Sequence, residues 1–265
     1  FWARLMNVPT PVPVGPAGAH GLRLSYCELP AMSRCTQGVS PTNSRMNQAA
    51  VTAQLSVPLY SAGQPSAEVR QLKETLGHAA RSACDGAIAF VCMDWRHMRE
   101  ILDAGETVFS ELKNLCVWNK TNGGMGSFYR SKHELVFVFK VGTASHTNSF
   151  GLGETGRYRT NVWDYPGISS LGGRRTDQLA MHPTVKPVAL VTDAIRDCSR
   201  RGEIVLDVFG GSGTTLIAAE TCGRQARVLE FDPAYCDTIL KRFETYTGKQ
   251  ATLTPKQTLF EDVAA

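Results

Sequence analysis

From Ser66 onwards, apolar residues recur at the spacings typical of helices and buried strands. Val69, Leu72 and Leu76 fall on one face of a predicted helix, and Ser66 is a suitable N-cap residue for it. The same pattern predicts helices over residues 94–104, 186–200, 213–222 and 233–246, and strands over 87–92, 112–118, 134–140, 203–207 and 226–231. Because apolar strands alternate with helices, we expect an α/β fold with a largely parallel sheet and helices on both faces.

The amino-terminal part of the chain has a different pattern. Residues 1–63 show no sustained helical or strand period, and they contain Pro9, Pro11, Pro13, Pro16, Pro30, Pro41 and Pro58. We therefore expect an irregular segment there, incomplete as a folded unit. A domain over 64–250 should follow, with a polar, loop-like insertion at about 141–181, and residues 251–265 should form a tail.

The composition is that of an ordinary globular protein. Its 265 residues are 43% hydrophobic, which is enough for one sizeable domain with its own core. No apolar run approaches the ~18 residues of a membrane-spanning helix, and no signal peptide is apparent. None of the eight cysteines forms a C-x-x-C pair, and Cys92 and Cys116 lie inside apolar runs. We expect reduced, mostly buried thiols in a cytoplasmic protein, with no disulfide framework, metal site or membrane partner.

The distribution of charge says more than its sum, which is a formal +4. Residues 120–175 contain eight Lys and Arg against three acids, an excess of five that outweighs the net charge of the whole chain. A basic region of this kind suits a polyanion such as nucleic acid. A solvated loop region rich in arginine is the alternative on charge alone.

The most informative local sequence is the apolar strand that ends at Asp207 and breaks into the glycine-rich turn of residues 208–215. Glycines let a backbone approach a ligand closely, and the start of the next helix supplies free N–H groups. Glu230 and Asp232 follow the next predicted strand, where a carboxylate can accept hydrogen bonds from ribose hydroxyls. The pattern favours a nucleoside site, although NAD-dependent enzymes use similar turns and a tight turn without a ligand is the simplest alternative.

Two motifs carry a family resemblance. The sequence LDVFGGSGTT over residues 206–215 resembles the S-adenosylmethionine (SAM) motif of amino-methylating DNA methyltransferases, and HPTVKP over 182–187 resembles the motif that precedes it in their permuted β class. The resemblance implies a Rossmann-like, SAM-dependent methyltransferase fold over about residues 64–248. It implies cofactor contacts from Asp207, Phe209, Gly210, Gly211, Ser212, Gly213, Thr214, Thr215, Glu230, Asp232, Thr184, Lys186 and Pro187.

The same resemblance implies transfer of a methyl group to an exocyclic amino group of a flipped DNA base, with adenine N6 favoured over cytosine N4. Double-stranded DNA is then the partner, and a homodimer stays open. The implied DNA-binding residues are Lys120, Phe128, Tyr129, Arg130, Lys132, Arg157 and Arg159, the last two in the region where the class keeps its target-recognition residues. The alternative is that Phe128 belongs to the core and that Arg130 and Lys132 are ordinary surface charges.

One expected motif is missing, so no catalytic residue is assigned. The family carries an Asp/Asn/Ser-Pro-Pro-Tyr/Phe segment, which should precede the Ser66 helix, and residues 1–65 contain no such tetrapeptide; the nearest echo is SVPLY over 56–60. A frameshift in the coding DNA would explain the gap, because codons for residues 32–35 read one base earlier can spell Asn-Val-Pro-Val. The alternatives are therefore an active methyltransferase, a SAM- or DNA-binding remnant without activity, and a Rossmann oxidoreductase.

Overall fold

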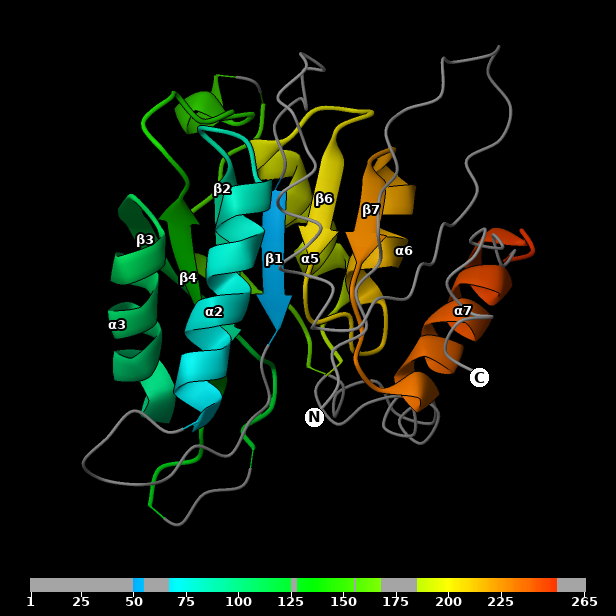
Figure 1. Ribbon diagram of the computed structural model, residues 1–265, viewed down its shortest axis with the longest axis horizontal. Coiled ribbons are helices and arrows are strands. Elements are labelled where there is room, and N and C mark those ends of the chain that lie inside the picture. Colours follow the sequence, from blue (N-terminus) through cyan, green and yellow to red (C-terminus); the bar gives the residue numbers. More distant parts are fainter. Residues whose placement is uncertain (1–49, 55–66, 125–127, 155, 168–184, 252–265) are drawn as a thin grey trace, which may run out of the picture.

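The computed structural model describes residues 50–54, 67–124, 128–154, 156–167 and 185–251, which form one seven-stranded sheet flanked by helices (Figure 1). The strands are β1 (Ala50–Gln54), β2 (Ile88–Met93), β3 (Glu111–Asn119), β4 (His133–Lys140), β5 (Val162–Asp164), β6 (Ile204–Asp207) and β7 (Gln225–Val228). The helices are α2 (Ala67–Ser82), α3 (Met98–Val108), α5 (Val188–Cys198), α6 (Thr214–Cys222) and α7 (Pro233–Thr247), with short 3₁₀ turns at Trp95–His97 and Gly151–Gly153.

The strand order is β5-β3-β4-β2-β1-β6-β7, and β4 alone runs against its neighbours. The carboxyl ends of the other six strands therefore meet at one edge of the sheet, which we call the carboxyl edge. In parallel α/β sheets, ligands bind outside this edge. The predicted fold class and largely parallel sheet are confirmed.

Both faces of the sheet are covered because side chains along each strand alternate between two apolar layers. On β2, Phe90 and Cys92 face a core formed with α5 and α6, whereas Val91 and Met93 face a core formed with α2 and α3. All six residues of β2 are buried, which is why the sequence shows a continuous apolar run rather than an alternation. A third cluster packs α7 against α6 and β7.

Two strands were not predicted from the sequence. β1 lies inside the segment expected to be irregular, yet it occupies the centre of the sheet, hydrogen-bonded to both β2 and β6. Its five residues, AVTAQ, are too few and too mixed to display a strand period. β5 has only three residues, exposed at both ends and buried in the middle. Tertiary pairing places both strands, since neither has a clear local signal.

Because β4 runs against its neighbours, the chain segments before and after it lie at opposite edges of the sheet. Residues 120–132 connect β3 to β4 at the carboxyl edge. Residues 141–161 leave β4 at the opposite edge, where Gly86 donates its backbone N–H to the carbonyl of Val141 at 2.7 Å. The described part of the proposed target-recognition insertion therefore starts far from the Asp207 turn. No helix in the described residues is long and apolar enough to cross a membrane.

Candidate cofactor and DNA site

The glycine-rich turn joins the ends of β6 and β7 into one structure. Asp207 is buried and its Oδ1 accepts a hydrogen bond from the backbone of Phe209 at 3.0 Å. The backbone N–H of Leu229 donates to the carbonyl of Asp207 at 2.8 Å, and that of Gly210 donates to Leu229 at 2.8 Å. The carboxyl ends of β6 and β7, which the motif predicts to hold a nucleoside, are thus adjacent at one edge of the sheet.

Glu230 closes the turn from the β7 side. Its Oε2 accepts from the backbone of Gly211 at 2.5 Å, while its Oε1 accepts from Phe231 and Asp232 at 2.8 and 2.9 Å. A carboxylate has about four lone-pair sites, so about one remains for a ligand hydroxyl. Asp232 is engaged as the N-cap of α7, because its side chain accepts from the backbone of Ala234 at 2.8 Å. By the same count Asp232 keeps about three lone-pair sites, so both carboxylates have capacity for a ribose hydroxyl.

Two glycines of the turn are required by packing as well as by any ligand. A Cβ on Gly210 would lie 2.5 Å from Cγ1 of Val228, a separation that real atoms do not tolerate. Gly213 has a φ of +77° and faces Ile239 on α7, so a side chain there would be both strained and crowded. The turn is held against β7 and α7 by its own glycines.

Arg242 on α7 fixes the far side of the turn, a role that no sequence pattern indicated. Its Nη1 donates to the carbonyl and hydroxyl of Ser212 at 3.0 and 3.1 Å and to the hydroxyl of Thr214 at 3.0 Å. Both hydroxyl residues are buried. Burial lowers the pKa of the Arg242 guanidinium, although this group stays protonated at any ordinary pH.

Lys186 lies at the same edge, just before α5, and is almost fully buried. Its ammonium pairs with Oε1 of Glu134 at 2.5 Å, and the other carboxylate oxygen of Glu134 pairs with Lys120 at 3.0 Å. Burial opposes the charged form of Lys186, but Glu134 and then Cys92 and Asp207 outweigh that effect and raise the pKa of the amine. The two lysines likewise hold the pKa of Glu134 below its usual range despite its burial. Lys186 and Glu134 are therefore both charged at neutral pH.

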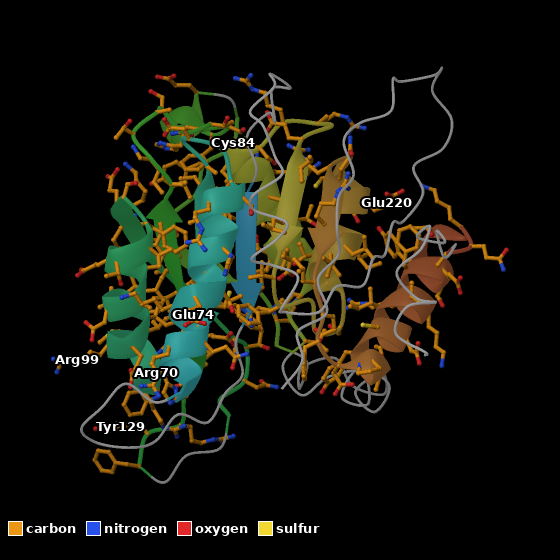
Figure 2. The ribbon with its side chains drawn as sticks, viewed as in Figure 1. Arg70, Glu74, Cys84, Arg99, Tyr129 and Glu220 are labelled. Carbon is orange, nitrogen blue, oxygen red and sulfur yellow. The ribbon has the colours of Figure 1, made fainter. Side chains whose placement is uncertain are left out.

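The loop between β3 and β4 presents two aromatic side chains to solvent. Phe128 and Tyr129 are 85% and 83% exposed and touch each other edge to face at 4.4 Å between ring centroids. Figure 2 shows Tyr129 projecting away from the body of the protein at the carboxyl edge. Arg130, predicted to bind phosphate, donates to the carbonyls of Gly123 and Gly124 at 2.8 and 3.0 Å and so stabilises the loop. The alternative that Phe128 belongs to the core does not hold in this structure.

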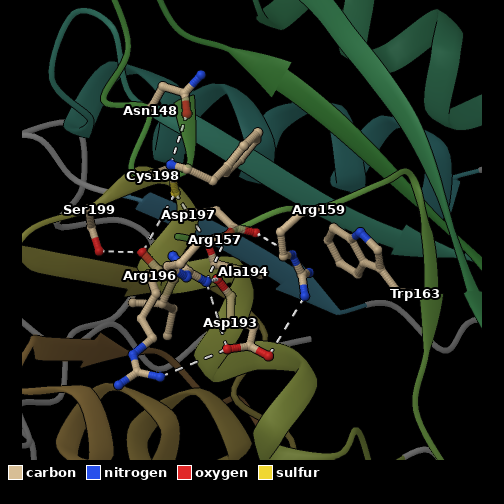
Figure 3. Close-up of polar contacts among 12 residues, drawn as sticks. Asn148, Arg157, Arg159, Trp163, Asp193, Ala194, Arg196, Asp197, Cys198 and Ser199 are labelled. Atoms are coloured by element: carbon tan, nitrogen blue, oxygen red, sulfur yellow. Dashed lines mark hydrogen bonds and ion pairs between the residues drawn. The ribbon is translucent and has the colours of Figure 1, made fainter. Parts of the chain in front are cut away.

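Arg157 and Arg159, also predicted to bind DNA, are engaged elsewhere. They form an ion-pair cluster with Asp193 and Asp197 on α5, shown in Figure 3 and called here the α5 cluster. Arg159 lies 3.0 Å from Asp197 through its Nε and donates to the hydroxyl of Tyr165 at 2.7 Å. These contacts lie on the side of the sheet to which β4 delivers the chain, and they indicate a structural role for both arginines. Their binding to DNA stays a prediction.

The remaining predicted residues have mixed outcomes. Lys132 is exposed on the loop, and Pro187 is the residue that precedes α5. Thr184 and the SVPLY echo lie outside the described residues. His97, which follows the carboxyl end of β2, is buried, and its Nδ1 lies 3.0 Å from a carboxylate oxygen of Asp94.

Cysteines and cavities add two further observations. Cys92, Cys116, Cys198 and Cys222 are buried free thiols, and burial raises the pKa of Cys92 to about 12. A cavity of about 560 Å³ lies between α2 and α3, and one of about 320 Å³ lies beside the α5 cluster. Neither is at the carboxyl edge, so the site assignment rests on strand-end chemistry. Residues 55–66 and 168–184 lie outside the described residues.

Similarity to known proteins supports the family that the two motifs indicated. Residues 64–241, more than half of the chain, match the DNA methylase family of N6 and N4 methyltransferases. The chain belongs to this family. The chain is 34% identical to the type II methyltransferase M.ScaI of Streptomyces caespitosus over 89 residues, covering 34% of this chain and 29% of that protein. It is 39% identical to the DNA adenine methyltransferase YhdJ of Escherichia coli K12 over 84 residues, covering 32% and 27%. The alignments thus span less than a third of each relative.

Solved structures agree on the fold. The M1.HpyAVI–SAM complex superposes on this chain with a TM-score of 0.61 and 21% identity, covering 81% of this chain and 94% of that one. The cytosine-N4-specific PvuII DNA methyltransferase gives a TM-score of 0.59 at 15% identity, covering 82% and 83%. Identities this low show a shared fold, and the SAM-dependent methyltransferase fold predicted from the sequence is confirmed.

Proposed function

We propose that this DNA methylase transfers a methyl group from SAM to an exocyclic amino group of a flipped base in double-stranded DNA, with adenine N6 as the target. The observation that carries the proposal is the convergence at one sheet edge of the Asp207 turn, Glu230, Lys186 and the exposed aromatic loop. A nucleoside-binding turn and a basic, aromatic surface are the two parts that such a reaction requires.

The described residues fit SAM in their donor set. Glu230 has about one lone-pair site left for a ribose hydroxyl, as counted above. The N-cap position of α6, Gly213, has no side-chain cap, so the first N–H groups of this helix suit the cofactor's carboxylate. Lys186 adds a buried positive charge at the same edge. When bound, SAM supplies an electrophilic methyl group on its sulfonium.

The chain's own residues then bind and orient the two substrates. The amino nitrogen of a paired base is inside the duplex, so the base must leave the stack before it can reach the carboxyl edge. Phe128 and Tyr129 offer exposed rings for stacking on bases, and Lys132 offers an exposed ammonium for a phosphate. The strand β1 reaches this edge at Gln54. Gln54 is the register partner of Cys92 on β2, and Asp207 lies on β6, the other neighbour of β1.

The choice of adenine rests on likeness to YhdJ, which is named as an adenine methyltransferase. Cytosine N4 is the alternative target on the same scaffold. A second candidate function is binding of SAM and DNA without turnover, and a specific observation favours it. The chain contains no Pro-Pro pair at all, so the family's Asp-Pro-Pro-Tyr type of segment is missing.

The decisive experiment measures SAM binding by calorimetry together with methyl transfer from radiolabelled SAM to unmethylated DNA. Transfer, followed by digestion to nucleosides, should yield N6-methyladenine; N4-methylcytosine would reassign the base. Binding without transfer would select the second candidate, and no SAM binding would overturn both. Asp207→Ala should lower SAM affinity at least tenfold, since breaking a hydrogen bond to a charged group costs about 1.5–3 kcal/mol. Glu106→Gln, an exposed acid on α3, is the matched control.

A further inference from the structure

One carboxylate joins the segment before α5 to the loop between β3 and β4. Glu134, the second residue of β4, accepts Lys186 on one oxygen and Lys120 on the other. Lys186 belongs to the proposed cofactor site, whereas Lys120 opens the loop that carries Phe128 and Tyr129. No other described contact between charged side chains links these two parts of the edge.

Two of the three charged groups, the ammonium groups, lie over one aromatic ring. Trp118 is the cross-strand partner of Glu134, so both side chains project from the same face of the sheet. The ammonium groups of Lys120 and Lys186 lie 4.4 and 5.8 Å from the centre of its ring. The indole is itself fixed, because it is 3% exposed and its N–H donates to the carbonyl of Tyr165 at 2.9 Å. Such a platform favours cations and keeps water away from the carboxylate.

The cluster of Lys120, Glu134 and Lys186 should therefore respond to a ligand that binds beside either lysine. Two ammonium groups compete for one carboxylate, and Lys120 is the more exposed of the two, with 28% of its side chain exposed against 4% for Lys186. A DNA phosphate beside the loop would attract Lys120, because charge-assisted contacts with phosphate are strong. Glu134 would then be left to Lys186 alone. A more firmly held Lys186 loses less side-chain freedom when the cofactor binds.

We propose that Glu134 is a positioning residue that couples the two substrates: DNA at the β3–β4 loop strengthens SAM binding at the Asp207 turn through the shared carboxylate. This inference rests on the proposed function, since it assumes that SAM and DNA bind at these two places. It adds a role for a residue that belongs to neither of the two proposed binding sites. By reciprocity, SAM must strengthen DNA binding by the same factor.

The test is calorimetric titration of SAM into the full chain, with and without a saturating mixed-sequence DNA duplex at low salt. DNA should raise SAM affinity at least fivefold in the unmodified protein. In Glu134→Gln, this ratio should fall to less than about twofold. Glu111→Gln is the matched control, because Glu111 also bridges two lysines, Lys113 and Lys140, at the other end of the same two strands. It should keep the full ratio.

The outcomes separate this proposal from the proposed function. If neither ligand binds the unmodified protein, both fail. If both bind without affecting each other, or if Glu134→Gln melts earlier yet keeps the fivefold ratio, the coupling role fails and the proposed function stands. Should Glu134→Gln not fold, Glu134→Asp decides, because it retains the charge but shortens the reach to one lysine. Its ratio must then fall below that of the unmodified protein, and an unchanged ratio would overturn the proposal.

Discussion

Replacing Arg159 by methionine removes a guanidinium from the centre of the α5 cluster while keeping an unbranched stem. The change breaks the 3.0 Å contact with Asp197, the hydrogen bond to Tyr165 and a cation–π contact with Trp163 at 4.8 Å. Arg157 still lies 2.8 Å from the other oxygen of Asp197. Breaking a buried pair costs about 3–5 kcal/mol. Because Arg157 remains, we expect the lower end, a loss of about 3 kcal/mol at pH 7.5.

The pKa of Asp197 determines whether the loss of stability should be larger at low or at high pH. Burial raises the pKa of Asp197 from 3.8 to about 6, with the two arginines acting in the opposite direction. The folded protein therefore holds this proton more tightly than the unfolded chain, and stability falls as the pH rises from about 4 to about 6. Removing Arg159 raises the folded-state pKa further, and each added unit costs about 1.4 kcal/mol at neutral pH. The loss should thus be larger at pH 7.5 than at pH 5.

Urea unfolding at both pH values measures the loss, and fluorescence anisotropy with a DNA duplex measures binding. Arg196→Met is the matched control, since Arg196 is 53% exposed and only 4.0 Å from Asp193; we expect less than about 1 kcal/mol. An equal loss at pH 5 and pH 7.5 would refute the electrostatic reasoning. Unchanged stability with weakened DNA binding would return Arg159 to the DNA-contact role that the sequence favoured.

Three further outcomes follow from the geometry. Gly210→Ala should lower the melting temperature and SAM affinity, because its Cβ would lie 2.5 Å from Val228, whereas Gly124→Ala, with its nearest neighbour at 3.5 Å, should do neither. Phe128→Ala should weaken DNA binding by about 1–3 kcal/mol, as loss of a stacking ring does, without changing the melting temperature. Cys92 should resist a thiol reagent until the protein unfolds, since burial raises its pKa to about 12; labelling of the native protein would contradict its burial.

The regular elements from α2 onwards could be predicted because their patterns are local. Apolar residues of α2 recur with the helical period, β2 and β4 are short continuous apolar runs, and Asp207 with its glycines marks where β6 must end. The site residues of the turn were predicted for the same reason, since a glycine with positive φ such as Gly213 leaves a mark in the sequence. The roles of Glu134 and Arg242 were missed because a single charge in a strand or helix does not reveal its partner.

The sequence by itself thus determined most of the helices and strands from α2 onwards, the position of the glycine-rich turn after Asp207 and the family to which the chain is related. Only the tertiary structure decided that β1 enters the centre of the sheet, that β4 runs against its neighbours and that Arg157 and Arg159 pair with α5. The physical reason is distance along the chain. A period or a glycine turn is written in adjacent residues, whereas strand order and ion pairs join residues tens of positions apart, and only the folded chain brings those together.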